Sequence, residues 1–306
     1  MAAIRLEFAQ FGHFDSFDVI RSTTSIADVA DVDLPTPIAT GLKTMHYVDA
    51  SVIKGLVYYY KVRVWRGGVS VMSGEISAIA DRDMYWGNVV SLIHFDDNLN
   101  DEKGILNYSI VGSVSYSGTA KFGKSLNLAD RTGMLVVNNP AVRLGGSDYT
   151  IECFINAKSS TMEVVNPAIF SISNNSSSGD QELIFGIKDD DKKLFFRVYD
   201  NGAYILNDIR SSTTISFNAW THVAIVRSGV NHYIFADGVL SASFSTPNNY
   251  ALLDKSVELI IGGLMGSGDR TRWGRFDGYI DEFRFTKGIA RYTENFTPPT
   301  KPFLNS

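Results

Sequence analysis

The alternation of hydrophobic and polar positions is clearest near the end of the chain, in residues 278–288 (GYIDEFRFTKG). Successive side chains of a strand point to opposite faces. One set is Tyr279, Asp281, Phe283 and Phe285, and the other is Ile280, Glu282, Arg284 and Thr286. The first set is mostly apolar, so we expect it to face a core. A carboxylate on a core face must be hydrogen-bonded, paired or bound to a cation, which makes Asp281 a candidate for a special role.

Short alternating or apolar runs recur along the rest of the chain. Residues 57–65 form a clear strand that ends in the turn Gly67-Gly68, and further runs lie at 89–95, 149–155 and 220–227. Asp237-Gly238, between two such runs, is the signature of a type I′ hairpin. No convincing helical pattern is present. About a dozen short strands in roughly 200 residues predict a two-sheet antiparallel sandwich for the larger part of an all-β protein.

The order of these signals divides the chain into two predicted domains. Residues 1–81 read as a small β-sandwich and residues 89–303 as a larger one. Between them, residues 82–88 are short and carry Tyr85 and Trp86, so we expect a semi-rigid linker rather than a flexible one.

Composition narrows the functional classes. The net charge of −5 and the absence of a clustered basic stretch give no argument for nucleic-acid binding. The single cysteine, Cys153, shares a strand face with Ile151 and Ile155, so we expect a buried thiol and no disulfide. The first residues lack a basic segment followed by an apolar one, so we expect no signal peptide, and no apolar run approaches the roughly 20 residues of a membrane-spanning helix.

Several motifs in residues 86–303 carry a family resemblance. The segments LIHFDDNLNDEKG, KFGKSLNL, AWTHVAIVRSG and GYIDEFRFTKGIARYTENFTPPTKPF occur in order. They resemble laminin-G-like (concanavalin A-like) jelly rolls, in the variant common in bacteriophage tail proteins. The resemblance implies an antiparallel jelly roll in which the first and last strands lie together. Phe95 and Asp96 would then lie near Ile280 and Asp281.

The smaller domain resembles a fibronectin type III module in its second half. The segment HYVDASVIKGLVYYYKVRVWRGGVSVMSGEISAIA, residues 46–80, carries this resemblance, with a tyrosine of the 58–60 run where the family has its tyrosine corner. The first half departs from the family pattern, because residues 27–37 look like a long loop. Such modules are usually spacers or adhesive joints.

The jelly-roll resemblance also implies a structural or ligand-bridging calcium ion, held here by Asp281 and Asp96. Oxygen ligands suit this hard cation, although two carboxylates are few for a site that takes six to eight oxygens. The alternative is that Asp281 accepts backbone hydrogen bonds or pairs with Arg284 or Arg291. Residues 189–191, three aspartates, lack the alternate-position spacing of a calcium loop and favour a solvated hairpin tip.

Catalysis is not expected. Glycoside hydrolysis needs two carboxyl groups across the scissile bond, and glycanases of this fold carry them as Glu-x-Asp-x-x-Glu on one strand. That motif is missing, and the adjacent Asp281 and Glu282 would point to opposite faces of a strand.

A polar loop, residues 266–275, is the candidate ligand-binding segment. It contains one tryptophan among three arginines: Trp273, Arg270, Arg272 and Arg275. Aromatic faces stack on sugars, and guanidinium groups bind the carboxylates of acidic glycans. The alternative is that the tryptophan packs on the sandwich edge while the arginines are solvated.

Together with these observations, the resemblance implies a non-catalytic, tail-associated phage virion protein that recognises host-surface carbohydrate through its laminin-G-like domain. It would be made in the host cytoplasm and reach the virion by assembly with other tail proteins, with homo-oligomerisation as a further expectation. The first alternative is a structural virion decoration or tail-joint protein that makes only protein contacts. The second is a glycan depolymerase.

Overall fold

The computed structural model describes residues 3–10, 12–53, 55–79, 83–159, 166–173, 181–200, 202–246, 257–264 and 274–305. In these residues the regular structure is strands, joined by three short 3-10 helices, Trp86–Asn88, Ala129–Arg131 and Pro140–Val142. This confirms the predicted all-β class. None of the described helices is long and apolar enough to cross a membrane. The chain divides into two compact units, Met1–Gly87 with Leu304–Ser306, and Asn88–Phe303.

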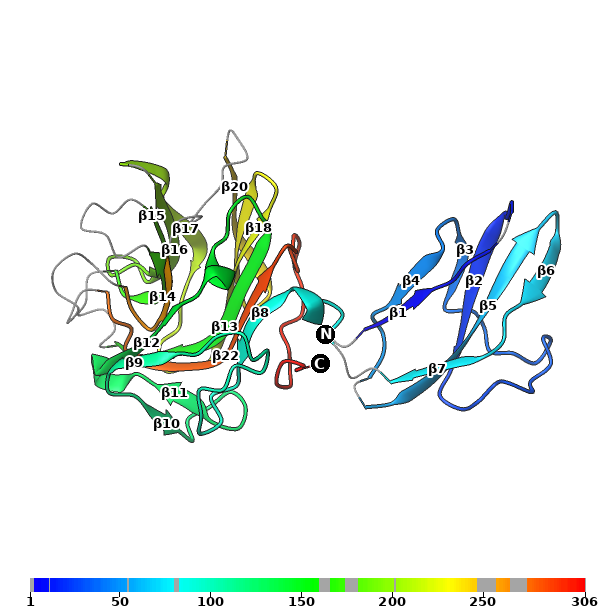
Figure 1. Cartoon of the computed structure of the whole chain (residues 1–306), viewed down its shortest axis with the longest axis horizontal. Helices are drawn as coiled ribbons and strands as arrows, with labels where there is room; N and C mark the ends of the chain where they lie inside the picture. The colour runs from blue at the N-terminus through cyan, green and yellow to red at the C-terminus, as the bar shows by residue number, and fades with distance from the viewer. Residues whose placement is uncertain are drawn as a thin grey trace. The chain divides into compact units, whose positions relative to one another are not determined.

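The first unit contains the blue to cyan strands of Figure 1. Their bounds are β1 Ile4–Glu7, β2 Ser16–Ser22, β3 Ala39–Leu42, β4 His46–Asp49, β5 Val57–Arg66, β6 Val69–Met72 and β7 Ile76–Ile79. β1 pairs with β4, and a second sheet has the order β3-β2-β5-β6 with β7 also on β5. Tyr58 and Tyr60 of β5 point into the core beside Leu6 and Val19, which explains why the tyrosine-rich strand forms here.

The Tyr58 hydroxyl and the buried carboxylate of Asp49 hold in place the segment of chain that leads into β5. The Ile53 N–H donates to the Tyr58 hydroxyl at 2.9 Å. Asp49, fully buried, accepts hydrogen bonds from Arg21 at 2.8 Å, the Tyr60 hydroxyl at 2.9 Å and the Ser51 hydroxyl at 2.7 Å. Burial by itself would raise the pKa of Asp49, but these hydrogen bonds outweigh it and hold the pKa below the ordinary value.

The second unit is a sandwich of two antiparallel sheets. The back sheet has the order β10-β11-β22-β13-β18-β19-β20 with β8 also on β22, and the front sheet has the order β17-β16-β15-β14-β21-β12-β9. The back-sheet strands are β8 Val89–Ile93, β10 Ser115–Ser117, β11 Ser125–Asn127, β13 Tyr149–Ala157, β18 Thr221–Ser228, β19 Asn231–Ala236, β20 Val239–Ser245 and β22 Gly278–Lys287. The front-sheet strands are β9 Ser109–Gly112, β12 Gly133–Asn138, β14 Ala168–Ser173, β15 Gln181–Ile187, β16 Lys193–Asp200, β17 Ala203–Thr214 and β21 Glu258–Ile261.

One large apolar core lies between the inner faces of the two sheets. Cys153 belongs to it together with Ile151 and Ile155, so the predicted burial of the thiol is confirmed, and burial raises its pKa well above the ordinary value. The hairpin at Asp237-Gly238 also agrees with the sequence, since both residues have positive φ (47° and 74°) between β19 and β20.

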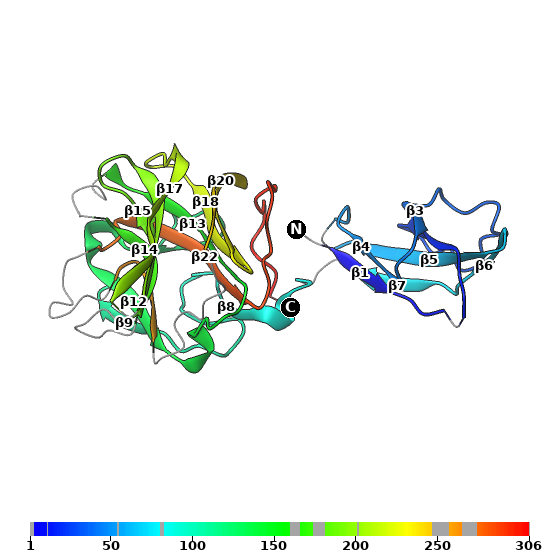
Figure 2. The same ribbon diagram turned by 90° about the horizontal axis from the view of Figure 1, so that it is seen from above.

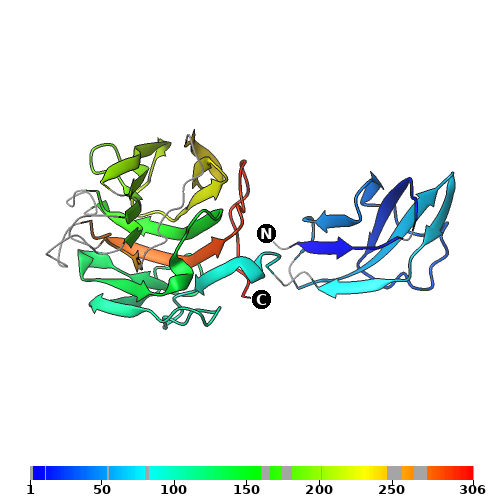
Figure 3. The ribbon, with the colours of Figure 1, turned by 45° about the horizontal axis from the view of Figure 1, so that its top comes forward.

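Strand β22 lies near the middle of the back sheet, between β13 on one side and β8 with β11 on the other (Figures 2 and 3). Phe283 of β22 pairs with Ile93 of β8, so the opening and closing strands lie side by side as expected. The strand is interrupted by a bulge, where Glu282 has φ 53° and the register against β13 shifts.

This bulge makes the predicted face assignment wrong at Ile280 and Asp281, although it is right at Phe283 and Phe285. Ile280, Phe283 and Phe285 belong to the core, whereas Asp281 pairs with Phe154 on the outer face of the back sheet. A bulge adds one residue to a strand and so reverses the alternation beyond it, which simple counting by two cannot anticipate.

Residues 289–303, which we call the strap, run over the outer face of the back sheet (red in Figures 1 and 2). Tyr292 and Phe296 stack on each other with centroids 3.6 Å apart, and both rings pack on Phe235. At the far end, the Phe303 N–H donates to Glu282 at 2.7 Å, and the Arg284 guanidinium lies 3.7 Å above the Phe303 ring.

Beneath the strap lies a buried charged cluster centred on Glu152. Its Oε1 accepts hydrogen bonds from Arg284 Nη2 at 2.7 Å and Nε at 2.9 Å. Its Oε2 lies 3.1 Å from both His222 Nε2 and the Tyr292 hydroxyl. Burial alone would raise the pKa of Glu152, but the Arg284 charge and the His222 contact dominate and hold it well below the ordinary range.

Candidate functional site

Asp281 and Asp96, the predicted calcium ligands, both hold the same segment of chain. Asp281 Oδ2 accepts hydrogen bonds from the N–H groups of Lys121 at 2.8 Å and Phe122 at 2.9 Å. Asp96 Oδ1 accepts from the Lys124 N–H at 2.7 Å. The two carboxylates therefore cap one loop, which is the backbone alternative considered for Asp281.

The geometry at this edge does not fit a calcium site. Among the described residues, no group of three His, Cys, Asp or Glu side chains could hold a metal ion. Asp281 Oδ1 is buried without a hydrogen-bond partner, but one spare oxygen is far from the six to eight that calcium takes. Burial raises the pKa of Asp281 to about 7, against the hydrogen bonds from the Phe122 and Lys121 amides.

Of the predicted binding loop, residues 266–275, the structure describes only Gly274 and Arg275. Trp273, Arg270 and Arg272 lie outside the described residues. Arg275 is buried, 8% exposed, and its Nη1 donates to the Arg131 carbonyl at 3.0 Å. The role predicted for the tryptophan and the first two arginines stays a prediction, while the guanidinium of Arg275 has a structural partner.

The described residues on either side of 265–273, Leu264 and Gly274, both contact the front sheet. On one side, Leu264 packs on the outer-face cluster of Ala168, Ile184 and Phe195. On the other side, the Ala168 N–H donates to the Gly274 carbonyl at 2.7 Å. The described residues on either side of 265–273 thus both contact the outer face of the front sheet.

That outer face carries a row of polar and aromatic side chains that the sequence reasoning did not select. Its members are paired across six neighbouring strands, from β12 through β21, β14, β15 and β16 to β17. At about 4.8 Å per strand the row spans roughly 24 Å. We call it the polar row: Asn138, Glu258, Ser173, Glu182, Tyr199 and Tyr204.

The β17 end of the polar row is aromatic and accessible. Tyr204 is 52% exposed, and its ring meets that of Tyr199 edge-on with centroids 5.0 Å apart. Arg197 precedes Tyr199 by two residues on β16, and its guanidinium carbon lies 5.8 Å from the centroid of the Tyr204 ring. An exposed tyrosine held by two neighbours is a rigid platform for a flat ligand surface, because little rotamer freedom is left to lose.

A charged pair continues the row. Arg197 Nη2 donates to Glu182 Oε1 at 3.3 Å, and both side chains are about a quarter exposed (27% and 22%). Burial raises the pKa of Glu182, although the Arg197 charge opposes the rise. Two atoms of this region, Arg197 Nε and Glu258 Oε2, are buried and have no hydrogen-bond partner among the described residues.

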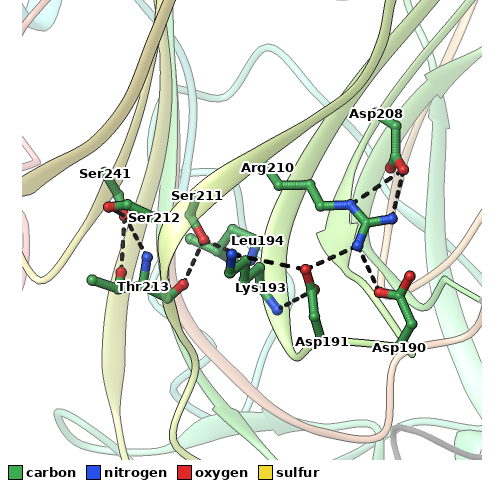
Figure 4. Close-up of polar contacts among 10 residues, drawn as sticks. All are labelled: Asp190, Asp191, Lys193, Leu194, Asp208, Arg210, Ser211, Ser212, Thr213 and Ser241. Carbon is green, nitrogen blue, oxygen red and sulfur yellow. Dashed lines mark hydrogen bonds and ion pairs between the residues drawn. The ribbon is translucent and has the colours of Figure 1, made fainter.

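The acidic hairpin tip on the same sheet is occupied by a guanidinium (Figure 4). Arg210 Nη1 donates to Asp190 at 2.8 Å and to Asp191 at 2.9 Å, while Nη2 donates to Asp208 at 2.8 Å. Lys188 also pairs with Asp208 at 3.1 Å. These carboxylates are already neutralised by side chains of the same chain, which argues against a second cation site at the tip.

The sequence did contain a signal for the polar row. Tyr199 and Tyr204 each lie one residue beyond Asp200 and Ala203, the pair at the end of the hairpin, so the hairpin places them opposite each other. The outward members on β15 and β21, Glu182 and Glu258, are far apart in the chain. Only the strand order joins them, and the sequence does not state that order.

The geometry defines a two-sheet β-sandwich in which one outer face is closed by the strap and the other presents polar and aromatic side chains. A family model described as the concanavalin A-like lectin/glucanases superfamily matches residues 131–290, just over half of the chain. The chain belongs to this superfamily, which confirms the jelly-roll fold predicted from the sequence.

Solved structures show the same fold. One is domain 4 of AbnA, a GH43 extracellular arabinanase from Geobacillus stearothermophilus, in complex with arabinotriose. It is 16% identical with a TM-score of 0.53, over 66% of this chain and 94% of that chain. Another is the binding domain of botulinum neurotoxin serotype C1, 15% identical with a TM-score of 0.50, over 66% of this chain and 49% of that one. At these identities the likeness concerns the fold alone. No curated protein matches the chain.

Proposed function

We propose that the second unit is a non-catalytic carbohydrate-binding module that binds glycans along the polar row. The observation that carries the proposal is the exposed Tyr204 ring, braced by Tyr199 and Arg197, beside the Glu182 carboxylate. A ring for the apolar face of a sugar next to hydrogen-bonding groups for its hydroxyls is the combination that sugar recognition requires. The arabinotriose-bound domain with the same fold supports this class of ligand.

The biological setting we propose is a phage virion, where the protein would act as a tail-associated adhesin for host-surface carbohydrate. The support is the motif resemblance in residues 86–303, together with the first unit. That unit pairs its strands as β1-β4 and β3-β2-β5-β6, and the Tyr58 hydroxyl closes a tyrosine corner on Ile53. Both features support a fibronectin type III-like spacer. In this setting, other tail proteins and copies of the chain itself are the expected partners.

Binding to an array of host-surface and plant oligosaccharides tests the proposal, with Tyr204→Ala as the diagnostic variant. We expect Tyr204→Ala to weaken the recognised glycan by about tenfold or more, as loss of a central aromatic contact does. Val239→Ala is the matched control, because Val239 is similarly exposed (51%) but lies on β20 of the back sheet. Binding that Tyr204→Ala leaves intact would place the site elsewhere, with the loop of Trp273 as the next candidate.

The first alternative is a structural virion protein that makes only protein contacts. It is favoured by aliphatic side chains on the edge strands β6 and β7 of the first unit, where Val69, Val71 and Ile76 are 69%, 66% and 53% exposed. Absence of glycan binding, together with loss of particle incorporation when Val69 and Val71 are changed to Thr, would favour this reading.

Hydrolysis remains the least supported alternative. The carboxylates of the polar row, Glu182 and Glu258, come from different strands with Ser173 of β14 between them. They do not reproduce the single-strand arrangement of glycanases of this fold. We expect no release of reducing ends from any glycan that binds.

A further inference from the structure

Resting on the proposed function, we infer that the polar row recognises a neutral oligosaccharide and discriminates against acidic glycans. The basis is the balance of donors, acceptors and charges that the described residues present on the outer face of the front sheet. This differs from the expectation drawn from the arginine-rich loop, which pointed to acidic sugars.

Acceptors dominate the row itself. Glu182 and Glu258 contribute two carboxylates, and the cation that the described residues place beside them, Arg197, pairs with Glu182 at 3.3 Å. Two negative charges and one positive charge leave a formal charge of −1. A ligand carboxylate placed here would meet like charge, which costs binding free energy, whereas sugar hydroxyls can donate to both glutamates.

The remaining cations of this face are already committed. Arg210 is surrounded by Asp190, Asp191 and Asp208, and Lys188 pairs with Asp208 (Figure 4). Recognition of an acidic sugar generally uses a guanidinium free to form two parallel hydrogen bonds. Among the described residues of the front-sheet strands, the three cations, Lys193, Arg197 and Arg210, each have a carboxylate partner.

The accessible polar groups indicate where hydroxyls would bind. Glu182 supplies carboxylate acceptors and Arg197 guanidinium donors, and both side chains are about a quarter exposed. A hydroxyl can serve both kinds of group, because it donates one proton and accepts through its lone pairs. The exposed members of the row stand at its two ends, Asn138 on β12 and Tyr204 on β17, while Ser173 between them is 5% exposed. A ligand that contacts both ends must therefore span roughly 24 Å, which an extended oligosaccharide does and a single sugar does not.

The test compares matched neutral and acidic glycans on the full chain. Probes are oligogalactosides against oligogalacturonides of equal length, and arabino-, malto- and lactosyl oligosaccharides, the last with and without a terminal sialic acid. Isothermal titration calorimetry gives Kd at low and moderate salt. We expect a neutral probe to bind at least tenfold more tightly than its acidic counterpart. We also expect its Kd to change little with salt, because no ion pair is involved.

Variants of the row make the test specific. Glu258→Gln should weaken the neutral probe by about tenfold and narrow the gap to the acidic one, since both the charged acceptor and the repulsion are lost. Asp148→Asn is the matched acidic control: Asp148 lies on the back-sheet side, where it accepts from the Gly229 N–H at 2.7 Å. It should leave the ratio of the two Kd values unchanged.

The outcomes distinguish a failure of the preference for neutral glycans from a failure of glycan binding itself. An acidic probe that binds as tightly as the neutral one, or a Kd for the neutral probe that Glu258→Gln does not change, overturns this inference while glycan binding stands. If no probe binds even as a multivalent conjugate, glycan binding and this inference both fail.

Discussion

Each outer face of the jelly roll is formed by one sheet of the sandwich, but the two faces differ in how far their charged side chains are exposed. The back sheet is covered by the strap, which closes over Glu152, Arg284 and His222 and leaves them at most 5% exposed. The front sheet keeps a row in which Glu182 and Arg197 remain about a quarter exposed. Each face therefore carries a glutamate paired with an arginine, but one pair stabilises the fold and the other is available to a ligand.

The largest expected difference comes from the two glutamates themselves. Glu152→Gln leaves the buried Arg284 charge without its counter-charge, and removal of one partner from a buried ion pair costs about 3–5 kcal/mol. Glu182→Gln, on the open face, should cost under about 1 kcal/mol because solvent screens the partner that remains. Urea unfolding of both variants measures the contrast, and equal losses would show that the faces are not distinct.

The strap offers a second comparison. Phe296→Ala removes the ring that stacks on Tyr292 and packs on Phe235, and we expect a loss of about 2 kcal/mol. Because the strap lies on the back sheet, glycan binding by the folded variant should be unchanged. Weakened binding at a temperature where the variant is fully folded would contradict the separation of the two faces.

The pH dependence of stability should differ in sign between the faces. The pKa of Glu152 is held below its ordinary value of 4.5, so its stabilising contribution is full above pH 4.5 and is lost as the pH falls below it. The pKa of Glu182 is raised, so the folded state binds its proton more tightly and stability falls as the pH rises above 4.5. Chemical unfolding between about pH 3 and pH 7 should therefore show wild type and Glu152→Gln converging at low pH. The free energy of unfolding of the wild type should fall relative to that of Glu182→Gln as the pH rises.

The smallest expected effect on stability belongs to the residue with the largest expected effect on binding. Tyr204→Ala changes an exposed side chain and should shift the free energy of unfolding by less than about 0.5 kcal/mol. Thermal unfolding of the variant beside Val239→Ala checks this. A destabilisation of more than about 1 kcal/mol would mean that Tyr204 stabilises the edge of the sheet, and it would argue against a role of this side chain in ligand binding.

Local patterns were enough to predict the all-β class, the buried Cys153 and the Asp237-Gly238 hairpin, while the pairing of the first and last strands of the second unit was implied by the family resemblance. They failed at β22, because the bulge at Glu282 depends on how β8, β11 and β13 meet that strand rather than on its own residues. The polar row was missed for a related reason. Glu258 and Glu182 become neighbours of Ser173 only through the strand order, which brings β21 and β15 to either side of β14.

The pairing of β8 with β22 also bears on how the module could be handled. Asn88, at the start of the second unit, donates its side-chain amide to the Lys287 carbonyl at 3.1 Å. Near the end of the unit, the Phe303 amide reaches Glu282, whose other carboxylate oxygen lies 2.7 Å from His94 Nδ1. Entry and exit points are thus both bound to one central strand. We therefore expect residues 88–303 to tolerate insertion into a loop of an unrelated scaffold as a single unit, with the front sheet left undisturbed.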